Sequence, residues 1–238
     1  MTQFYDVLAP VLGVCCGLAL LLLVILLLIG PKRRFWVVLL FASWEFLATI
    51  GLTLADLFLH GTTQGDPAHP SRAGRLYAQL YWNNDVIEDL LRFVVVTVLI
   101  YMVVGRSKPV IGRILSGVVL AMIVLPFVLF HPTFPVPKAA WYNSTSQLLN
   151  FGAAIMNLIL FGALIQARKR DPQILAVSIG LGILVTGASV SYGLRHFVSQ
   201  GGFAAAFNLL LNLTQLAAWL ILCRAFWPSP RRNPAPSP

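Results

Sequence analysis

The chain has 238 residues, of which 58% are apolar and only 11% are charged. Soluble globular domains are roughly 45–50% apolar and about 25% charged, and a single domain of this length would leave much of its apolar surface in water. The composition, with a mean hydropathy of +0.81, therefore argues against a soluble enzyme or a nucleic-acid-binding domain and favours a chain solvated mostly by lipid.

Seven apolar runs follow one another along the chain, and each is close to the ~20 residues that a helix needs to cross the hydrocarbon core. The runs are continuous, which is typical of helices and not of alternating barrel strands. The sequence predicts an all-α, polytopic membrane protein, with a single seven-transmembrane-helix bundle over 1–227. Its predicted helices are about 8–29, 35–59, 82–104, 110–130, 146–167, 173–196 and 203–226.

The positive charges predict the orientation of this bundle. The net charge is +9, from 17 Lys and Arg against 8 Asp and Glu. With the N-terminus outside, 12 of the 17 basic residues fall in the inner loops and tail, three fall outside, and two lie within helices. Because cytoplasmic loops are enriched in Lys and Arg, we expect an outer N-terminus and a cytoplasmic C-terminus. The segment 228–238 has five prolines and two arginines and is expected to be a disordered, basic cytoplasmic tail.

Charged residues inside the second and third predicted helices carry most of the functional signal. Glu45 lies near the middle of the second helix, and Asp56 follows 11 residues later on the same face. In the third helix, four charges at i, i+3, i+4 and i+7 form one stripe that enters from the outer side: Asp85, Glu88, Asp89 and Arg92. Because intramembrane charge is costly, such residues are expected to face other helices, water or a partner.

The later helices add further polar side chains, and almost all of them fall in the predicted outer half of the membrane, including Asn150, Ser189, Tyr192 and Gln215. We therefore predict a polar cavity, open to the outside, that is built by the second, third, fifth, sixth and seventh helices. Arg92 would be its internal cation, balanced by neighbouring acids. The candidate ligand-binding residues are Glu45, Asp56, Glu88, Asp89, Arg92, Asn157, Arg195, Asn208 and Asn212.

A purely structural interpretation of the same residues stays open. Arg92 could pair with an acid of its own helix, and the asparagines could join helices through hydrogen bonds worth ~0.6 kcal/mol each. Glu45 is the candidate most indicative of function, because it is the deepest acid and has no cation within reach on its own helix.

Catalytic and cofactor motifs are not found in the sequence. The three cysteines and four histidines lack the spacing of a disulfide framework or a zinc site, and no lysine lies inside an apolar run to hold retinal. No P-loop, GxSxG or CxxC motif occurs. We therefore expect a protein that is not an enzyme and has no cofactor and no bound metal, although metal or haem at the outer histidines stays open.

Small residues predict close helix packing. Gly13 and Gly17 form a GxxxG motif that could serve a homodimer or packing within the chain, and the glycine-rich sixth helix is expected near the centre. A faint repeat relates 32–60 to 169–196, so the helices can be grouped as 3+1+3 with parallel halves. This layout resembles that of SWEET-type sugar transporters, without their prolines in the first two helices of each repeat except Pro10 at the edge.

Three functions are compatible with these features. The first is a receptor or sensor of the plasma or bacterial inner membrane that binds a small ligand and signals through a separate cytoplasmic partner. The second is a small transporter in which Glu45 takes up and releases a proton. The third is an accessory subunit whose polar faces bind another membrane protein. The polar outer half and the apolar inner half favour the first over the second, since a transporter needs polar groups along its whole path. The first and the third stay open alike, because a buried polar face can meet a ligand or a neighbouring protein equally well.

Overall fold

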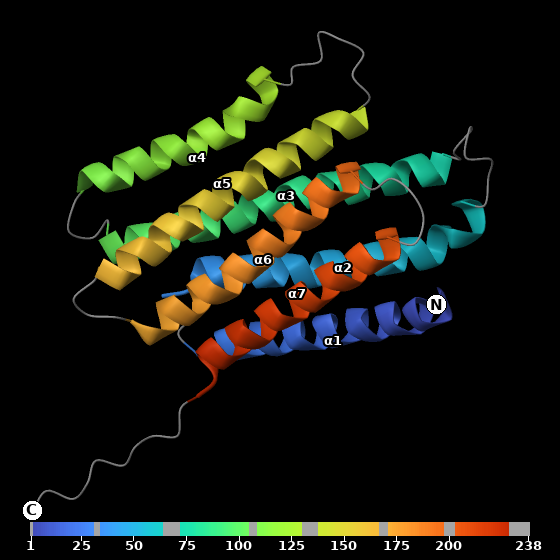
Figure 1. Ribbon diagram of the computed structural model, residues 1–238, viewed down its shortest axis with the longest axis horizontal. Coiled ribbons are helices and arrows are strands. Elements are labelled where there is room, and N and C mark those ends of the chain that lie inside the picture. Colours follow the sequence, from blue (N-terminus) through green and yellow to red (C-terminus); the bar gives the residue numbers. More distant parts are fainter. Residues whose placement is uncertain are drawn as a thin grey trace, which may run out of the picture.

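The computed structural model describes residues 2–30, 34–63, 72–104, 109–129, 138–166, 171–197 and 203–228. These residues form seven helices and, within the described ranges, no strand, so the predicted all-α class is confirmed. Successive helices run in opposite directions and lie roughly side by side (Figure 1). They are α1 (Thr2–Ile29), α2 (Trp36–Thr63), α3 (Arg72–Val104), α4 (Pro109–Leu129), α5 (Lys138–Gln166), α6 (Pro172–Phe197) and α7 (Phe203–Phe226).

Five of the helices are long and apolar enough to cross a membrane, which supports a multi-pass membrane protein. Their apolar stretches are Pro10–Ile29, Trp36–Ala55, Ser144–Gln166, Pro172–Val190 and Leu209–Phe226. The apolar stretch of α4 is shorter, over Val110–Pro126. The longest helix, α3, carries its charged stripe in the middle, which lowers its mean hydropathy.

Several helices extend beyond the ranges that the apolar runs predict. Helix α1 starts at Thr2, α2 continues to Thr63, α3 starts at Arg72 and α5 starts at Lys138. The apolar runs mark only residues that suit hydrocarbon, whereas backbone hydrogen bonding continues the helices through the polar residues beyond them. All four extensions lie at the same end of the bundle (Figure 1). Of the predicted tail 228–238, all but the first residue lies outside the described residues.

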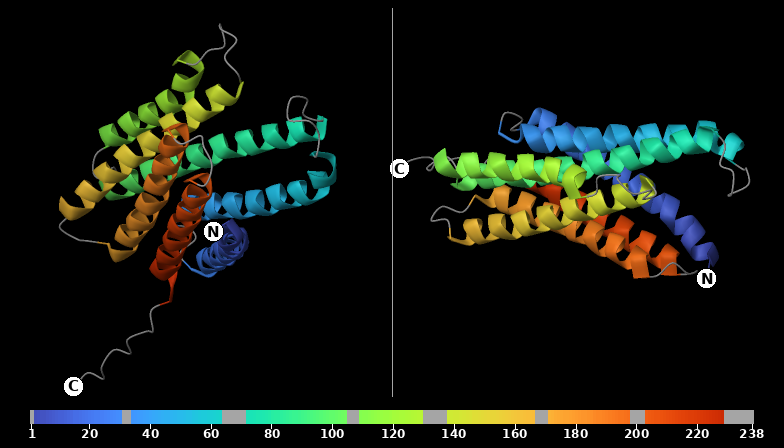
Figure 2. Two further views of the ribbon diagram at one scale, coloured as in Figure 1. Left: turned by 45° about the vertical axis from the view of Figure 1, so that its right-hand side comes forward. Right: turned by 90° about the horizontal axis from the view of Figure 1, so that it is seen from above.

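Five helices form a closed ring. Helix α1 packs on α2, α2 on α3, α3 on α6, α6 on α7, and α7 returns to α1. Helix α5 packs on α3 and α6 from outside the ring, and α4 lies at the edge of the molecule against α3 and α5 (Figure 2). Helix α3 therefore contacts four neighbours and occupies the centre of the molecule, while α6 contacts three.

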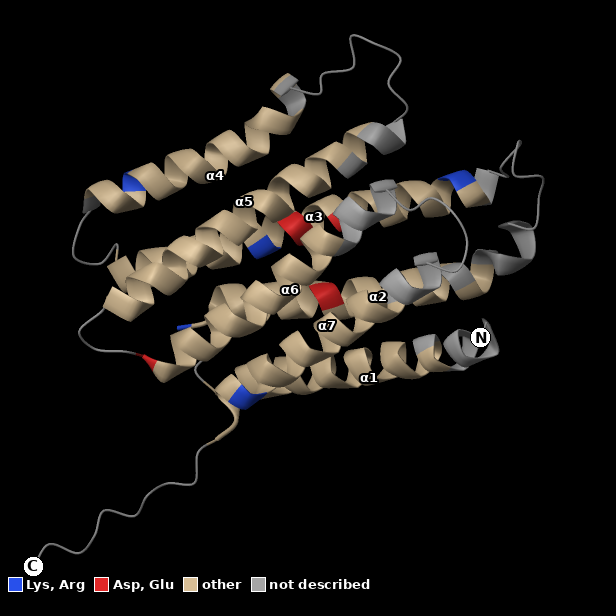
Figure 3. Ribbon diagram, in the orientation of Figure 1, with Lys and Arg blue, Asp and Glu red and all other residues tan. Residues whose placement is uncertain are grey.

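The apolar core fills the end of the bundle at which α1, α3, α5 and α7 finish. We call this end the core end and the opposite end the cavity end. There, the rings of Phe35 and Phe226 meet edge to face at 5.0 Å, and those of Phe41 and Trp219 lie 5.8 Å apart. Figure 3 shows described basic residues at this end, among them Arg224 on α7. Its fully buried aliphatic residues include Leu23, Leu27, Val95, Leu99, Leu160, Leu181, Leu184 and Leu222.

Glycines of α6 let its neighbours approach closely, as the glycine-rich sequence predicts. A Cβ atom added at Gly180 would lie 2.8 Å from Leu222 Cγ and 3.3 Å from the Ala218 carbonyl oxygen of α7. At Gly182 the added atom would lie 2.6 Å from the Asn157 amide nitrogen of α5. Both positions therefore have room for hydrogen alone, which fixes the spacing of α5, α6 and α7.

We expect Gly180→Ala to lower the free energy of unfolding by about 1–2 kcal/mol, because overpacking α6 against α7 outweighs the gain in helix propensity. Gly162→Ala on α5 is the matched control, since a Cβ there meets nothing within 4 Å. The control should be neutral or slightly stabilising. Unfolding of both purified variants in mixed detergent micelles measures the difference, and equal effects would contradict the assigned contact.

Candidate functional site

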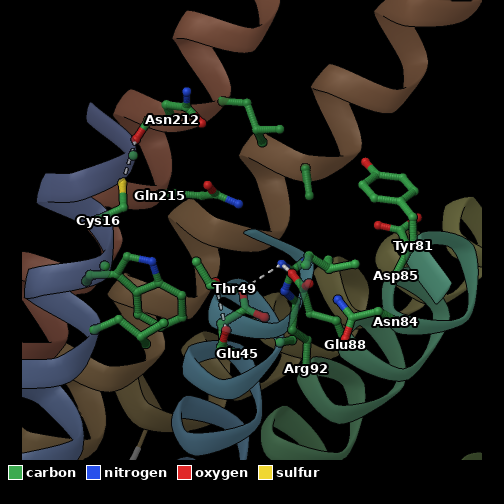
Figure 4. Close-up of a pocket in the computed structure, with 18 residues that line it drawn as sticks. Cys16, Glu45, Thr49, Tyr81, Asn84, Asp85, Glu88, Arg92, Asn212 and Gln215 are labelled. Atoms are coloured by element: carbon green, nitrogen blue, oxygen red, sulfur yellow. Dashed lines mark hydrogen bonds and ion pairs between the residues drawn. The ribbon is translucent and has the colours of Figure 1, made fainter. Parts of the chain in front are cut away.

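A cavity of about 280 Å³ lies inside the five-helix ring, toward the cavity end (Figure 4). Leu20 and Trp219, which belong to the apolar core, line it on the core side. The remaining wall is rich in polar side chains from α2, α3 and α7. These are Glu45, Thr49, Tyr81, Asn84, Asp85, Glu88, Arg92, Asn212 and Gln215.

Arg92 forms ion pairs with three carboxylates. Its Nη1 lies 2.9 Å from Asp89 Oδ1, and its Nη2 lies 3.4 Å from Glu45 Oε1 and also contacts Glu88 Oε1. Only 4% of the Arg92 side chain is exposed. Glu88 and Asp89 precede Arg92 by four and three residues on α3, whereas Glu45 comes from α2. The network therefore joins the two helices at a buried point, where each charge needs an opposite charge nearby.

The charges around the cavity do not balance. Glu45, Asp85, Glu88 and Asp89 surround a single guanidinium group, and both terminal nitrogens of that group already contact carboxylates. Arg92 is therefore engaged within the protein and does not present a free cation to a ligand. The carboxylates of the wall offer hydrogen-bond acceptors, and these favour ligands that carry N–H donors or positive charge.

Neutral contacts hold the rest of the cavity wall. The Trp44 indole N–H donates to Asn84 Oδ1 at 3.1 Å, which links α2 to α3. The Cys16 thiol donates to the Asn212 carbonyl oxygen at 3.5 Å, which links α1 to α7. The Gln215 side chain points into the cavity (Figure 4). The amide groups of α7 thus face the acidic wall of α2 and α3 across the open space.

The GxxxG motif of α1 contributes space. Gly13 and Gly17 both line the cavity, and a Cβ added at either position would meet nothing within 4 Å. The sequence suggested that these glycines serve a homodimer or close packing within the chain. In the structure they make no close helix contact within the chain, and their small size leaves part of the ring interior open; a homodimer through this motif stays a prediction.

The structure brings together four of the nine predicted ligand-binding residues in the cavity wall: Glu45, Glu88, Arg92 and Asn212. Asp89 does not line the cavity but pairs with Arg92 beside it. The side chains of Asp56, Arg195 and Asn208 lie outside the part that the structure describes.

Asn157 lies in a different place from the other described candidates. Its Oδ1 accepts a hydrogen bond from the Ser178 hydroxyl at 3.2 Å, and it lines a separate groove among α5, α6 and α7. The sequence predicted that the fifth helix contributes to the cavity wall. In the structure, α1 contributes to it and α5 does not. A polar residue on α5 faces α3 or α6 because α5 packs outside the ring.

Sequence reasoning left out several wall residues that share the face of Glu88 and Arg92. Asp85, a member of the charged stripe that was not among the candidate ligand-binding residues, also lines the cavity. Tyr81 and Asn84 precede Glu88 by seven and four residues, so helical spacing places both of them on the same side of α3. Extending the charged stripe by one turn toward the N-terminus of α3 would have found them.

Among the described residues, no group of three or more His, Cys, Asp or Glu side chains is arranged to hold a metal ion. The side chains of His60, His69, His131 and His196 lie outside that part of the structure. Comparison with protein-family models, curated proteins and solved structures finds no match. The geometry of the cavity is therefore the basis on which its function is argued.

We expect Arg92→Leu to lower the free energy of unfolding by about 3–5 kcal/mol, because it leaves Glu45, Glu88 and Asp89 buried without their cation. Adding Glu45→Gln to Arg92→Leu should restore part of the loss, since one uncompensated charge is removed. Chemical unfolding in detergent measures each variant.

Arg34→Leu is the control for this prediction. Arg34 pairs with Asp171, but its side chain is 46% exposed, and an exposed ion pair contributes about 0–1 kcal/mol. Equal losses in the Arg34 and Arg92 variants would contradict the buried network.

Proposed function

We propose that the chain is a seven-span membrane protein that binds a small, positively charged or donor-rich ligand in this cavity. In the proposal it acts as a sensor that signals through a separate cytoplasmic partner and catalyses no reaction. The observation that carries the proposal is a cavity whose wall holds three carboxylates, while the one guanidinium beside them is already paired.

The cavity volume sets the size of the ligand. About 280 Å³ corresponds to roughly nine water molecules at ~30 Å³ each, near the lower end of ligand pockets. Glu45, Asp85 and Glu88 can accept from an ammonium group, and the rings of Tyr81 and Trp219 can receive a cation on their faces. We therefore favour a compact amine with a short apolar body.

The burial of charge in α3 supports counting it as a sixth span. In the proposal, α4 is the seventh, through its shorter apolar stretch Val110–Pro126. Arg92 and Asp89 are 3% and 1% exposed, so the charges that lower the hydropathy of α3 would not meet lipid. With the N-terminus outside, the cavity end faces the exterior of a plasma or bacterial inner membrane. The core end, with its basic residues, then faces the cytoplasm and a protein partner.

The arrangement gives a physical route for a signal. Glu45 on α2 and Glu88 on α3 both contact Arg92, so a cation that competes for these carboxylates would loosen the link between the helices. The ring continues below the cavity as tightly packed core, through which a shift of α2 against α3 would reach the core end. The ligand would thus act on the contact between α2 and α3, whose carboxylates can pair either with Arg92 or with the ligand.

A transporter is the second candidate, favoured by a symmetry in the packing. Helix α1 packs on α2 and α2 on α3, as α5 packs on α6 and α6 on α7; between the two sets, α3 packs on α5 and α7 on α1. If α1, α2 and α3 are exchanged with α5, α6 and α7, the same six helix pairs are obtained, as a 3+1+3 repeat requires. Such repeats are common in transporters. Accumulation of the ligand in liposomes, lost in Glu45→Gln, would favour this candidate over the sensor.

We expect small primary and quaternary amines to raise the melting temperature of the purified protein, and Gly17→Leu to abolish that shift. The substitution fills the cavity without removing a polar group, and a Cβ there meets nothing within 4 Å. Gly162→Leu is the control with equal room outside the cavity, and it should keep the shift. An amine shift that survives in Gly17→Leu would place the binding elsewhere and refute the proposal.

The proposed orientation has its own test. A C-terminal green fluorescent protein fusion should fluoresce in bacteria and a C-terminal alkaline phosphatase fusion should be inactive, because the former folds in the cytoplasm and the latter requires the periplasm. The opposite pattern would place the cavity end in the cytoplasm.

A further inference from the structure

A second polar cluster lies between α3 and α5, beside the cavity. Asp85 and Asp89 are one helical turn apart on α3, and Ser146 and Asn150 are one turn apart on α5. The two helices run in the same direction (Figure 1), and the Ser146 hydroxyl donates to Asp85 Oδ2 at 3.1 Å. Ser146 and Asn150 also lie next to the Asp89 carboxyl group. The four side chains therefore face one another across the contact between the helices.

Several polar atoms of this cluster are buried without a hydrogen bond of ordinary geometry. They are Asp89 Oδ2, both the oxygen and the nitrogen of the Asn150 amide, and the hydroxyl of neighbouring Thr145. Asp89 is 1% exposed and Asn150 is fully buried. Each such atom destabilises the folded protein when nothing replaces the water it has lost, and native proteins rarely leave several together. The cluster thus has the composition expected of a site that binds an additional group.

We propose that the α3–α5 cluster binds one monovalent cation of the size of Na⁺, with Asp89 Oδ2, Asn150 Oδ1 and Ser146 Oγ as protein ligands. Carboxylate, amide and hydroxyl oxygens are the ligands that hard cations prefer. A single charge suits the site, because Asp89 Oδ1 is already paired with Arg92 and Asp85 accepts from Ser146. Divalent cations generally need several carboxylates, and the described residues contain no such metal-binding group.

The charges and the position of the cluster support a cation. Four carboxylates stand around Arg92 alone, so one added positive charge reduces the excess of buried negative charge. Asp85 both lines the cavity and accepts from Ser146, and it therefore connects the cluster to the cavity through which a cation would enter. The site stands on its own contacts and does not require that the cavity bind an amine.

The test compares the melting temperature of the full chain in NaCl, KCl and RbCl at equal ionic strength, followed by tryptophan fluorescence; none of these salts contains an amine that could bind in the cavity. We expect sodium to raise the melting temperature by about 3–6 °C at a concentration about ten times its dissociation constant. Asn150→Leu should abolish this shift. Equilibrium binding of radioactive sodium to the wild-type protein gives a second measurement that depends on no variant.

Asn157→Leu provides the matched control, because it makes the same substitution two turns further along α5, where the amide accepts from Ser178 instead. It should keep the full sodium shift. The proposal is overturned if the wild-type protein melts at the same temperature in all three salts, or if it binds no sodium. It is also overturned if Asn150→Leu keeps the sodium shift, as expected for an amide that merely lacks a partner.

Discussion

The rest of the structure depends on how one guanidinium group is held inside an apolar bundle. Arg92 could not be buried without its carboxylates, and Glu45, Glu88 and Asp89 could not be buried without Arg92. Two of these acids lie on the same helix, so they compensate charge without constraining the fold. Glu45 comes from α2, and its pairing fixes how α2 and α3 are placed. The contact between Glu45 and Arg92 therefore both compensates a charge of α3 and positions two neighbouring helices of the ring.

The division of the bundle into two ends follows from that constraint. Toward the core end, residues such as Phe41, Leu99 and Leu222 fill the interior and leave no room for water. Toward the cavity end, the charged network needs polar neighbours, and Gly13 and Gly17 supply space instead of packing. The ring is therefore tight where it is apolar and open where it is polar, and the polar part is where a ligand could exchange with solvent.

The sequence predicts the helices and the polar half well, because both depend on local patterns of hydropathy and charge. The helical period places Glu88 and Arg92 on one face, and the same period would have added Tyr81 and Asn84. Which helices close the ring cannot be predicted from such local patterns, because it depends on contacts between distant parts of the chain. Asn157 has the residue type of a cavity residue, but α5 packs outside the ring, and hydropathy along one helix does not reveal its neighbours. The contribution of α1 was missed for the converse reason, since its cavity residues are glycines.

Helix α3 joins the two polar clusters because its charges are divided between neighbouring faces. Glu88 and Arg92 face the cavity, Asp89 faces both Arg92 and α5, and Asp85 touches both places. A change in charge on one side, whether an amine at Glu88 or a cation at Asp89, must alter the electrostatic energy on the other, since they share Arg92 at short range. The free-energy coupling between two such ligands is reciprocal. Because Glu45 of α2 and two acids of α3 share the one guanidinium of Arg92, a charge bound at either cluster would be linked to the packing of α3 against its neighbours.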